Sequence, residues 1–141
     1  MIEIIKIKNI DAALIIRNNY TDLKSNSSIK FFTDNQDTLQ LGYMKRPKGY
    51  KIQPHLHLKV PRTVHFTDEV LIIKKGEIKV NFYTLELKHA KSITLYKGDI
   101  ILLKNVPHGF DITEDSEIIE VKQGPYVGED DKKKFNEDKK I

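Results

Sequence analysis

The sequence of 141 residues predicts an all-β protein, a sandwich or barrel built from short strands. Three observations support this fold class. Short segments in which apolar residues alternate with polar ones, or form brief apolar runs, recur along the chain. Turn signals containing glycine, such as Gly76 and Gly98, separate these segments. The middle of the chain lacks the 3.6-residue apolar periodicity of a helix.

The expected elements follow one another in order. The first twenty residues suit either a strand or a short helix, and residues 25–28 are expected to form a loop. A turn is expected at residues 46–49, a hairpin at 74–77 and a second tight turn at 97–99. Strands are expected at residues 29–32, 38–44, 50–53, 70–73, 78–83, 92–96, 100–103, 108–112 and 117–121.

Length and composition predict one domain. The hydrophobic content of 39% and the charged content of 31% are typical of a globular protein with a modest core. We expect a domain over residues 1–128, with its core at about 39–121, and a charged tail over 129–141 that is disordered or forms a short terminal helix.

Composition also excludes several classes of protein. No apolar run approaches the roughly 18–20 residues of a membrane span, and the amino terminus does not resemble a signal peptide. The chain has no cysteine and therefore no disulfide or thiolate metal site. We therefore expect a cytoplasmic protein with no membrane partner.

The net charge of +4 does not predict a nucleic-acid partner. Only three of the 24 basic residues are arginine, the side chain that base edges and phosphates favour, namely Arg17, Arg46 and Arg62. The lysines are scattered, and the densest run, residues 132–134, is flanked by acidic residues. We expect no nucleic-acid binding.

His55 and His57 form the most informative pair of side chains in the sequence. In a strand, alternate side chains lie on the same face, about 7 Å apart along the strand. Two imidazoles at this spacing can reach one metal ion at a metal–nitrogen distance of about 2.0–2.1 Å. Two histidines on a solvated face would show the same pattern.

The residues around this pair resemble the first signature motif of the cupin superfamily. That motif consists of a glycine, a His-x-His pair, a glutamate and a second glycine, and Gly49, His55, His57, Glu69 and Gly76 match it. The resemblance implies a single cupin barrel, also described as a double-stranded β-helix or jelly roll.

The second cupin motif runs from a Gly-Asp turn to a histidine. Gly98, Asp99 and His108 match it, with Pro107 directly before the histidine. The two motifs together imply one divalent metal ion bound by His55, His57, Glu69 and His108. Three imidazoles and one carboxylate suit Mn, Fe, Ni, Zn or Cu, and this ligand set does not choose among them.

The sequence departs from the family pattern in two places. The gap between His57 and Glu69, residues 58–68, is longer than usual, so His65, which has the same strand parity as Glu69, is an alternative ligand. We otherwise expect His65 to line the mouth of the pocket. The Pro-x-Gly turn before His108 is missing. Further candidates for contact with a substrate, polar or aromatic side chains near the expected ligands, are Gln53, Lys59, Arg62, Tyr43 and Phe110.

A finer resemblance points to carbohydrates. Residues 41–44, 47–50, 69–76 and 120–126 are similar to a group of small bacterial cupins associated with surface-polysaccharide biosynthesis. This resemblance implies a small-molecule partner such as a sugar or sugar nucleotide. Because cupins commonly pair through edge strands, we also expect a homodimer to which the amino-terminal strands contribute.

Four functions remain open from the sequence. We favour a metal-dependent isomerase or epimerase acting on a small, polar, carbohydrate-like substrate. The alternatives are a cupin that binds a sugar without catalysis and an Fe(II) dioxygenase. A fourth alternative, an epimerase with a histidine base and a tyrosine acid, requires no metal.

Overall fold

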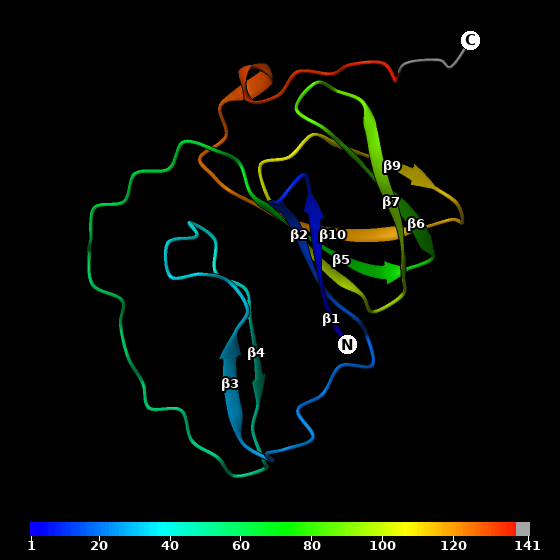
Figure 1. Cartoon of the computed structure of the whole chain (residues 1–141). Coiled ribbons are helices and arrows are strands. Elements are labelled where there is room, and N and C mark those ends of the chain that lie inside the picture. Colours follow the sequence, from blue (N-terminus) through cyan, green and yellow to red (C-terminus); the bar gives the residue numbers. More distant parts are fainter. Residues whose placement is uncertain (138–141) are drawn as a thin grey trace. The chain divides into compact units, whose positions relative to one another are not determined.

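The computed structural model describes residues 1–137 (Figure 1). It divides into two compact units. The first unit combines Met1–Tyr20 with the chain from Thr67 onward, and the second unit consists of Thr21–Phe66. Each unit is described by itself below.

The first unit contains two antiparallel sheets. The five-stranded sheet has the order β1-β2-β8-β5-β10 and the three-stranded sheet has the order β7-β6-β9. The strands are β1 (Ile2–Ile7), β2 (Ile10–Ile16), β5 (Glu69–Lys75), β6 (Glu77–Tyr83), β7 (His89–Tyr96), β8 (Ile100–Leu103), β9 (His108–Ile112) and β10 (Glu117–Lys122). The all-β prediction is confirmed, and the ambiguous amino terminus forms two strands.

One apolar core joins the two sheets. Alternate side chains of a strand point to one face, and in the five-stranded sheet this face buries Ile15, Leu71 and Ile101. From the three-stranded sheet Val80 and Phe82, which are fully buried, enter the same cluster. Because both sheets contribute to a single cluster, they pack face to face as the layers of a sandwich do.

Two glycines occupy turns that no other residue would fit. Gly76 and Gly98 have φ angles of +87° and +88°, in the left-handed region that glycine adopts without strain. A Cβ atom at Gly76 would lie 2.3 Å from the carbonyl oxygen of Asp115, and one at Gly98 would lie 2.7 Å from the Cβ of Asn18. These contacts explain why the predicted hairpin and the predicted tight turn both carry glycine.

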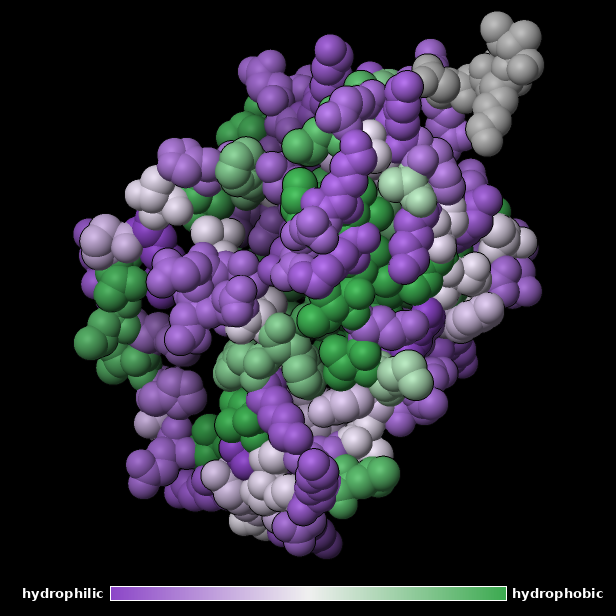
Figure 2. Space-filling view, in the orientation of Figure 1, coloured by the Kyte–Doolittle hydropathy of each residue, from purple (hydrophilic) through white to green (hydrophobic). Residues whose placement is uncertain are grey.

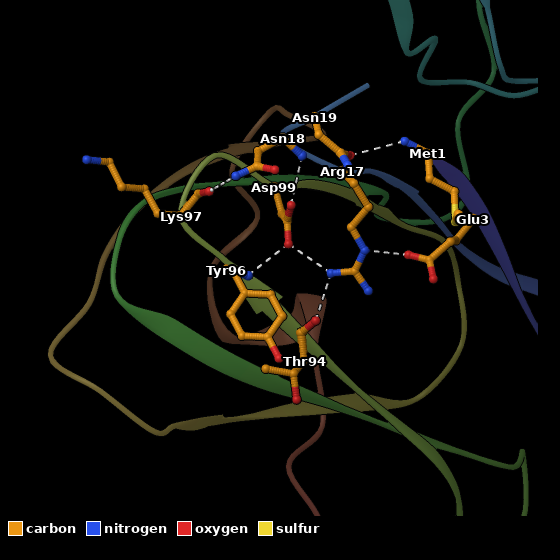
Figure 3. Close-up of polar contacts among 9 residues, drawn as sticks. All are labelled: Met1, Glu3, Arg17, Asn18, Asn19, Thr94, Tyr96, Lys97 and Asp99. Atoms are coloured by element: carbon orange, nitrogen blue, oxygen red, sulfur yellow. Dashed lines mark hydrogen bonds and ion pairs between the residues drawn. The ribbon is translucent and has the colours of Figure 1, made fainter. Parts of the chain in front are cut away.

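Asp99 and Arg17 connect the amino-terminal hairpin to the turn between β7 and β8 (Figure 3). The Arg17 guanidinium donates to Asp99 Oδ2 at 2.8 Å and to Glu3 Oε2 at 2.5 Å. The backbone N–H groups of Asn18 and Tyr96 donate to the same Asp99 carboxylate at 2.9 and 2.8 Å. Burial opposes the charge of Arg17, but these two carboxylates outweigh it and raise the pKa of Arg17.

The second unit contains a single hairpin. Strand β3 (Ser28–Phe31) pairs with strand β4 (Gly42–Lys45) in an antiparallel ladder. The predicted turn at residues 46–49 forms, because Tyr50 N–H donates to the carbonyl of Pro47 at 3.1 Å. The chain then continues to residue 66 without regular secondary structure.

Two strand predictions in the second unit need correction. The strand expected at residues 50–53 is wrong, because this segment has no strand character in the structure. A strand needs a hydrogen-bonded neighbour, and none of the three sheets among residues 1–137 includes a partner for residues 50–53. The strand expected at residues 38–44 begins only at Gly42.

The start of the charged tail contacts Thr67 and Tyr83, which belong to the same unit. It begins with a 3₁₀ turn, η1 (Gly128–Asp131), and Thr67 Oγ1 donates to Asp131 Oδ1 at 2.6 Å. The Phe135 ring packs edge-on against Tyr83 at 5.1 Å, and the Tyr83 hydroxyl donates to Glu137. Burial, together with Glu137, raises the pKa of Tyr83 to about 12. Residues 138–141 of the predicted tail lie outside the described residues.

The strands of residues 1–137 form three separate sheets and no closed barrel. The structure therefore confirms antiparallel β architecture, whereas the cupin barrel expected from the motifs stays a prediction. In the same part of the chain, no helix has the length and apolar character needed to cross a bilayer.

Candidate functional site

Glu69 and His108 meet inside the first unit. Glu69 is the first residue of β5 and lies on the same strand face as the buried Leu71 and Ile73. His108 is the first residue of β9 and lies directly opposite the buried Phe82 of β6. The two sheets thereby bring His108 Nε2 to 2.7 Å from Glu69 Oε1.

The second nitrogen of His108 is fixed by the backbone. Nδ1 lies 2.8 Å from the carbonyl oxygen of Val106, which can only accept a hydrogen bond, so Nδ1 carries a proton. In this arrangement the ring donates from both nitrogens and carries a positive charge. Burial opposes that charge, but the hydrogen bonds to Glu69 and Val106 outweigh it and raise the pKa of His108.

The pKa of Glu69 shifts in the opposite direction to that of His108. The hydrogen bond from His108 lowers the pKa of the Glu69 carboxyl to about 2, although its partial burial works against ionisation. Glu69 is therefore a carboxylate at neutral pH.

Glu120 and Lys122 extend this site from the neighbouring strand. In the pairing of β10 with β5, Lys122 lies opposite Glu69 and Glu120 lies opposite Leu71, so both side chains share the face of Glu69. The carboxyl of Glu120 hydrogen-bonds to Glu69, and this contact, together with burial, raises the pKa of Glu120. Sequence reasoning missed both residues, because their place beside Glu69 depends on the register of β10 against β5, which alternation alone does not fix.

Phe110 lies beside His108. It follows His108 by two residues in β9, and the two ring centroids lie 5.5 Å apart. The Phe110 side chain is partly exposed, so it forms an apolar wall that a ligand could reach. The structure thus places this predicted contact residue next to His108.

His55 and His57 lie together in the second unit. Their ring centroids are 5.3 Å apart and nearly perpendicular, and both residues are exposed. Nδ1 of His55 lies 2.9 Å from the carbonyl oxygen of Gln53. The Gln53 side chain is not part of this contact.

The other predicted contact residues also belong to the second unit. Lys59, Arg62 and His65 are exposed along the segment without regular structure. Tyr43 lies on β4, where its hydroxyl contacts Thr21 Oγ1 at 3.2 Å and accepts a hydrogen bond from the Asp22 N–H at 3.3 Å.

The structure thus pairs Glu69 with His108 and His55 with His57, each pair within its own unit. Among residues 1–137, no three or more histidine, aspartate or glutamate side chains are grouped so that they could hold a metal ion. Of the two alternative ligands, Glu69 contacts His108 in the first unit, and His65 is exposed in the second unit.

Comparisons with known proteins add no family to this description. No family model, no curated protein and no solved structure matches the chain.

Proposed function

We propose that this chain is a metal-binding cupin in which His55, His57, Glu69 and His108 bind one divalent transition-metal ion. The observation that carries the proposal is the contact of 2.7 Å between Glu69 Oε1 and His108 Nε2. It brings a carboxylate and an imidazole together from two different sheets, in the residues that the two motifs nominate. The sequence motifs, rather than the geometry, support adding His55 and His57.

The hydrogen bonds of the histidines support the same proposal. A histidine that binds metal through Nε2 commonly donates Nδ1–H to a backbone carbonyl, which fixes the tautomer and the ring orientation. His108 makes this contact with Val106, and His55 makes it with Gln53. In His55 Nε2 is the ring nitrogen that remains for a metal, whereas in His108 a metal would replace the proton that Nε2 donates to Glu69.

The alternation of apolar and polar residues at 50–66 supports a barrel in which this segment is one of the strands. Leu56, Leu58, Val60, Val64 and Phe66 alternate with more polar residues, as in a half-buried strand, yet their side chains are exposed. Leu56 and Leu58 are 78% and 76% exposed, and Figure 2 shows apolar side chains on the surface of this segment. Pairing with a sheet would bury this apolar face at about 25 cal/mol per Å². His55 and His57 alternate with Leu56 and Leu58, so they would leave the opposite face of such a strand.

For the reaction, we propose isomerisation or epimerisation of a small polar substrate related to a carbohydrate. A bound divalent ion would supply Lewis-acid polarisation of a carbonyl or of neighbouring hydroxyl oxygens. Phe110, beside His108, offers an apolar surface on which one face of a sugar ring can pack. The carbohydrate substrate class rests on the sequence resemblance.

Elemental analysis of the purified protein tests the proposal. We expect about one transition-metal ion per chain, and its loss when His55 and His57 are both changed to alanine, because each change removes a ligand. His65→Ala is the matched control and should keep the ion. A double variant with full metal content would refute the ligand assignment, and a metal-free wild type would favour the epimerase that uses a histidine base and a tyrosine acid.

We also propose a homodimer with a contribution from the amino-terminal strands. β1 lies at the edge of the five-stranded sheet, and an open strand edge on a small domain invites pairing. Sedimentation equilibrium at micromolar concentration should give twice the chain mass of 16.4 kDa. A mass equal to one chain would contradict this expectation.

A further inference from the structure

We propose that the outer face of the three-stranded sheet is a peptide-binding site, which the chain's own tail occupies as a tethered ligand. The outer face is the side turned away from the core, and it carries Asn81, Tyr83, His89, Ser92 and Asp111. Its ligand is an acidic peptide in which an aromatic residue precedes a glutamate by two positions, as Phe135 precedes Glu137. The inference does not depend on the proposed metal ion, because none of these side chains is a proposed ligand.

Two side chains on the outer face are buried although they point away from the core. Along β6, Phe82 enters the core cluster, so its neighbours Asn81 and Tyr83 leave the strand on the other face. On a face open to water such side chains would be exposed, yet Asn81 and Tyr83 are only 6% and 4% exposed. Other groups must therefore cover this part of the sheet.

The tail supplies part of this cover. The Tyr83 ring contacts the Phe135 ring edge-on at 5.1 Å, and the Tyr83 hydroxyl donates to the Glu137 carboxylate. Phe135 is half-buried, whereas residues 132–134 and 136–137 are exposed. In the described part of the tail, Phe135 and Glu137 are thus the anchors on Tyr83. Such a small anchor can open locally while the sheets stay folded.

A chain of hydrogen bonds holds the site in place beneath the tail. Asn81 Nδ2 donates to Asp111 Oδ2 at 2.9 Å, so the amide Oδ1 accepts from Ser92 Oγ at 2.6 Å. The Ser92 hydroxyl has then used its proton, so its Oγ accepts from His89 Nε2 at 2.7 Å. The imidazole of His89 lies edge-on to the Tyr83 ring, with the ring centroids 5.7 Å apart. Because none of these contacts involves the tail, the site keeps its shape when the tail leaves.

The chemistry of the tail defines which other peptide can bind. Tyr83 offers an aromatic ring for edge-to-face contact and a hydroxyl that donates to a carboxylate. A peptide with both groups at the spacing of Phe135 and Glu137 meets the same partners. The tethered tail competes with that peptide at an effective concentration of roughly 1 mM, which weakens a Kd of about 0.1 mM about tenfold.

Fluorescence anisotropy with a labelled synthetic peptide of residues 129–137 tests the inference on the full-length protein. In the double variant Phe135→Ala/Glu137→Gln the tail no longer holds the site, so the peptide should bind about tenfold more tightly than to the wild type. Asn136→Ala changes an exposed residue between the anchors and is the matched control, with a Kd within about twofold of the wild type. A peptide carrying Phe135→Ala should bind the double variant about tenfold more weakly.

The outcomes decide between this site and its alternatives. Equal affinities of the wild type and the double variant, or no binding to either, would overturn the inference. Sedimentation equilibrium of the double variant tests whether the tail is instead exchanged between two copies. An unchanged mass agrees with a tether within one chain, whereas a fall from the mass of a dimer to that of one chain would overturn it.

A single variant keeps the test decisive if the double variant does not fold. Glu137→Gln alone removes the acceptor of the Tyr83 hydroxyl and should tighten peptide binding about threefold. An unchanged Kd in this variant would overturn the inference.

Discussion

Replacing Asp99 with alanine is expected to lower the free energy of unfolding by about 3–5 kcal/mol, because it breaks a buried ion pair on one side only. The Asp99 side chain is 2% exposed and accepts hydrogen bonds from Arg17 and from two backbone N–H groups. Without the carboxylate, the two backbone N–H groups lose their buried acceptor and, among the described residues, the partly buried guanidinium keeps only Glu3 as a carboxylate partner. Urea denaturation followed by circular dichroism measures the loss.

Two controls identify the cause of this loss. Asp115→Ala removes the same charge from an exposed side chain and should change stability by less than about 0.5 kcal/mol. In a double-mutant cycle, Arg17→Met should add less destabilisation to Asp99→Ala than to the wild type, since the guanidinium has already lost its buried partner. Additive losses would show that Asp99 stabilises the turn alone and that the pair with Arg17 contributes nothing.

The sequence predicted the part of the fold that local chemistry determines. The glycines at 76 and 98 mark turns with positive φ, and the segments between them alternate as half-buried strands do, so most elements from Val70 onward were foreseen. The contact of Arg17 with Asp99 was not foreseen, because the two residues are 82 positions apart. Nothing local in either segment specifies such a partner.

The residues of the candidate site were likewise only partly predictable from the sequence. Glu69 and His108 were identified by motif spacing, and the structure brings them together. Glu120 was not predicted, because its position beside Glu69 depends on the register of β10 against β5, which sequence alternation does not fix. The strand expected at residues 50–53 failed for a related reason, since alternation predicts a strand only where a neighbour completes its hydrogen bonds.

The contact between Glu69 and His108 is expected to stabilise the metal-free protein most between about pH 4.5 and 6.5, by on the order of 2 kcal/mol. The pKa of Glu69 falls from 4.5 to about 2 on folding, so its contribution is present above pH 4.5 and is lost as the pH falls toward 2. The pKa of His108 rises from 6.5, so its contribution is present below pH 6.5 and is lost as the pH rises through the folded value.

Glu69→Gln removes the negative charge of Glu69 and keeps the shape of its side chain. The difference in unfolding free energy between wild type and this variant, measured with a chelator present, should be largest near pH 5.5 and smaller at pH 3 and pH 9. A difference that does not vary with pH would show that the contact is an uncharged hydrogen bond, contrary to the double donation inferred for His108.

Added metal should change this pH dependence, because a proton and a metal ion compete for Nε2 of His108. Below the raised pKa of His108, metal binding must release that proton, so the affinity should fall about tenfold for each pH unit. Titrations with Mn²⁺ in buffers of different ionisation enthalpy count the protons released. Release of at least one proton per ion below the raised pKa of His108 would agree with Nε2 as a ligand atom, whereas release of none would mean that the ion binds elsewhere.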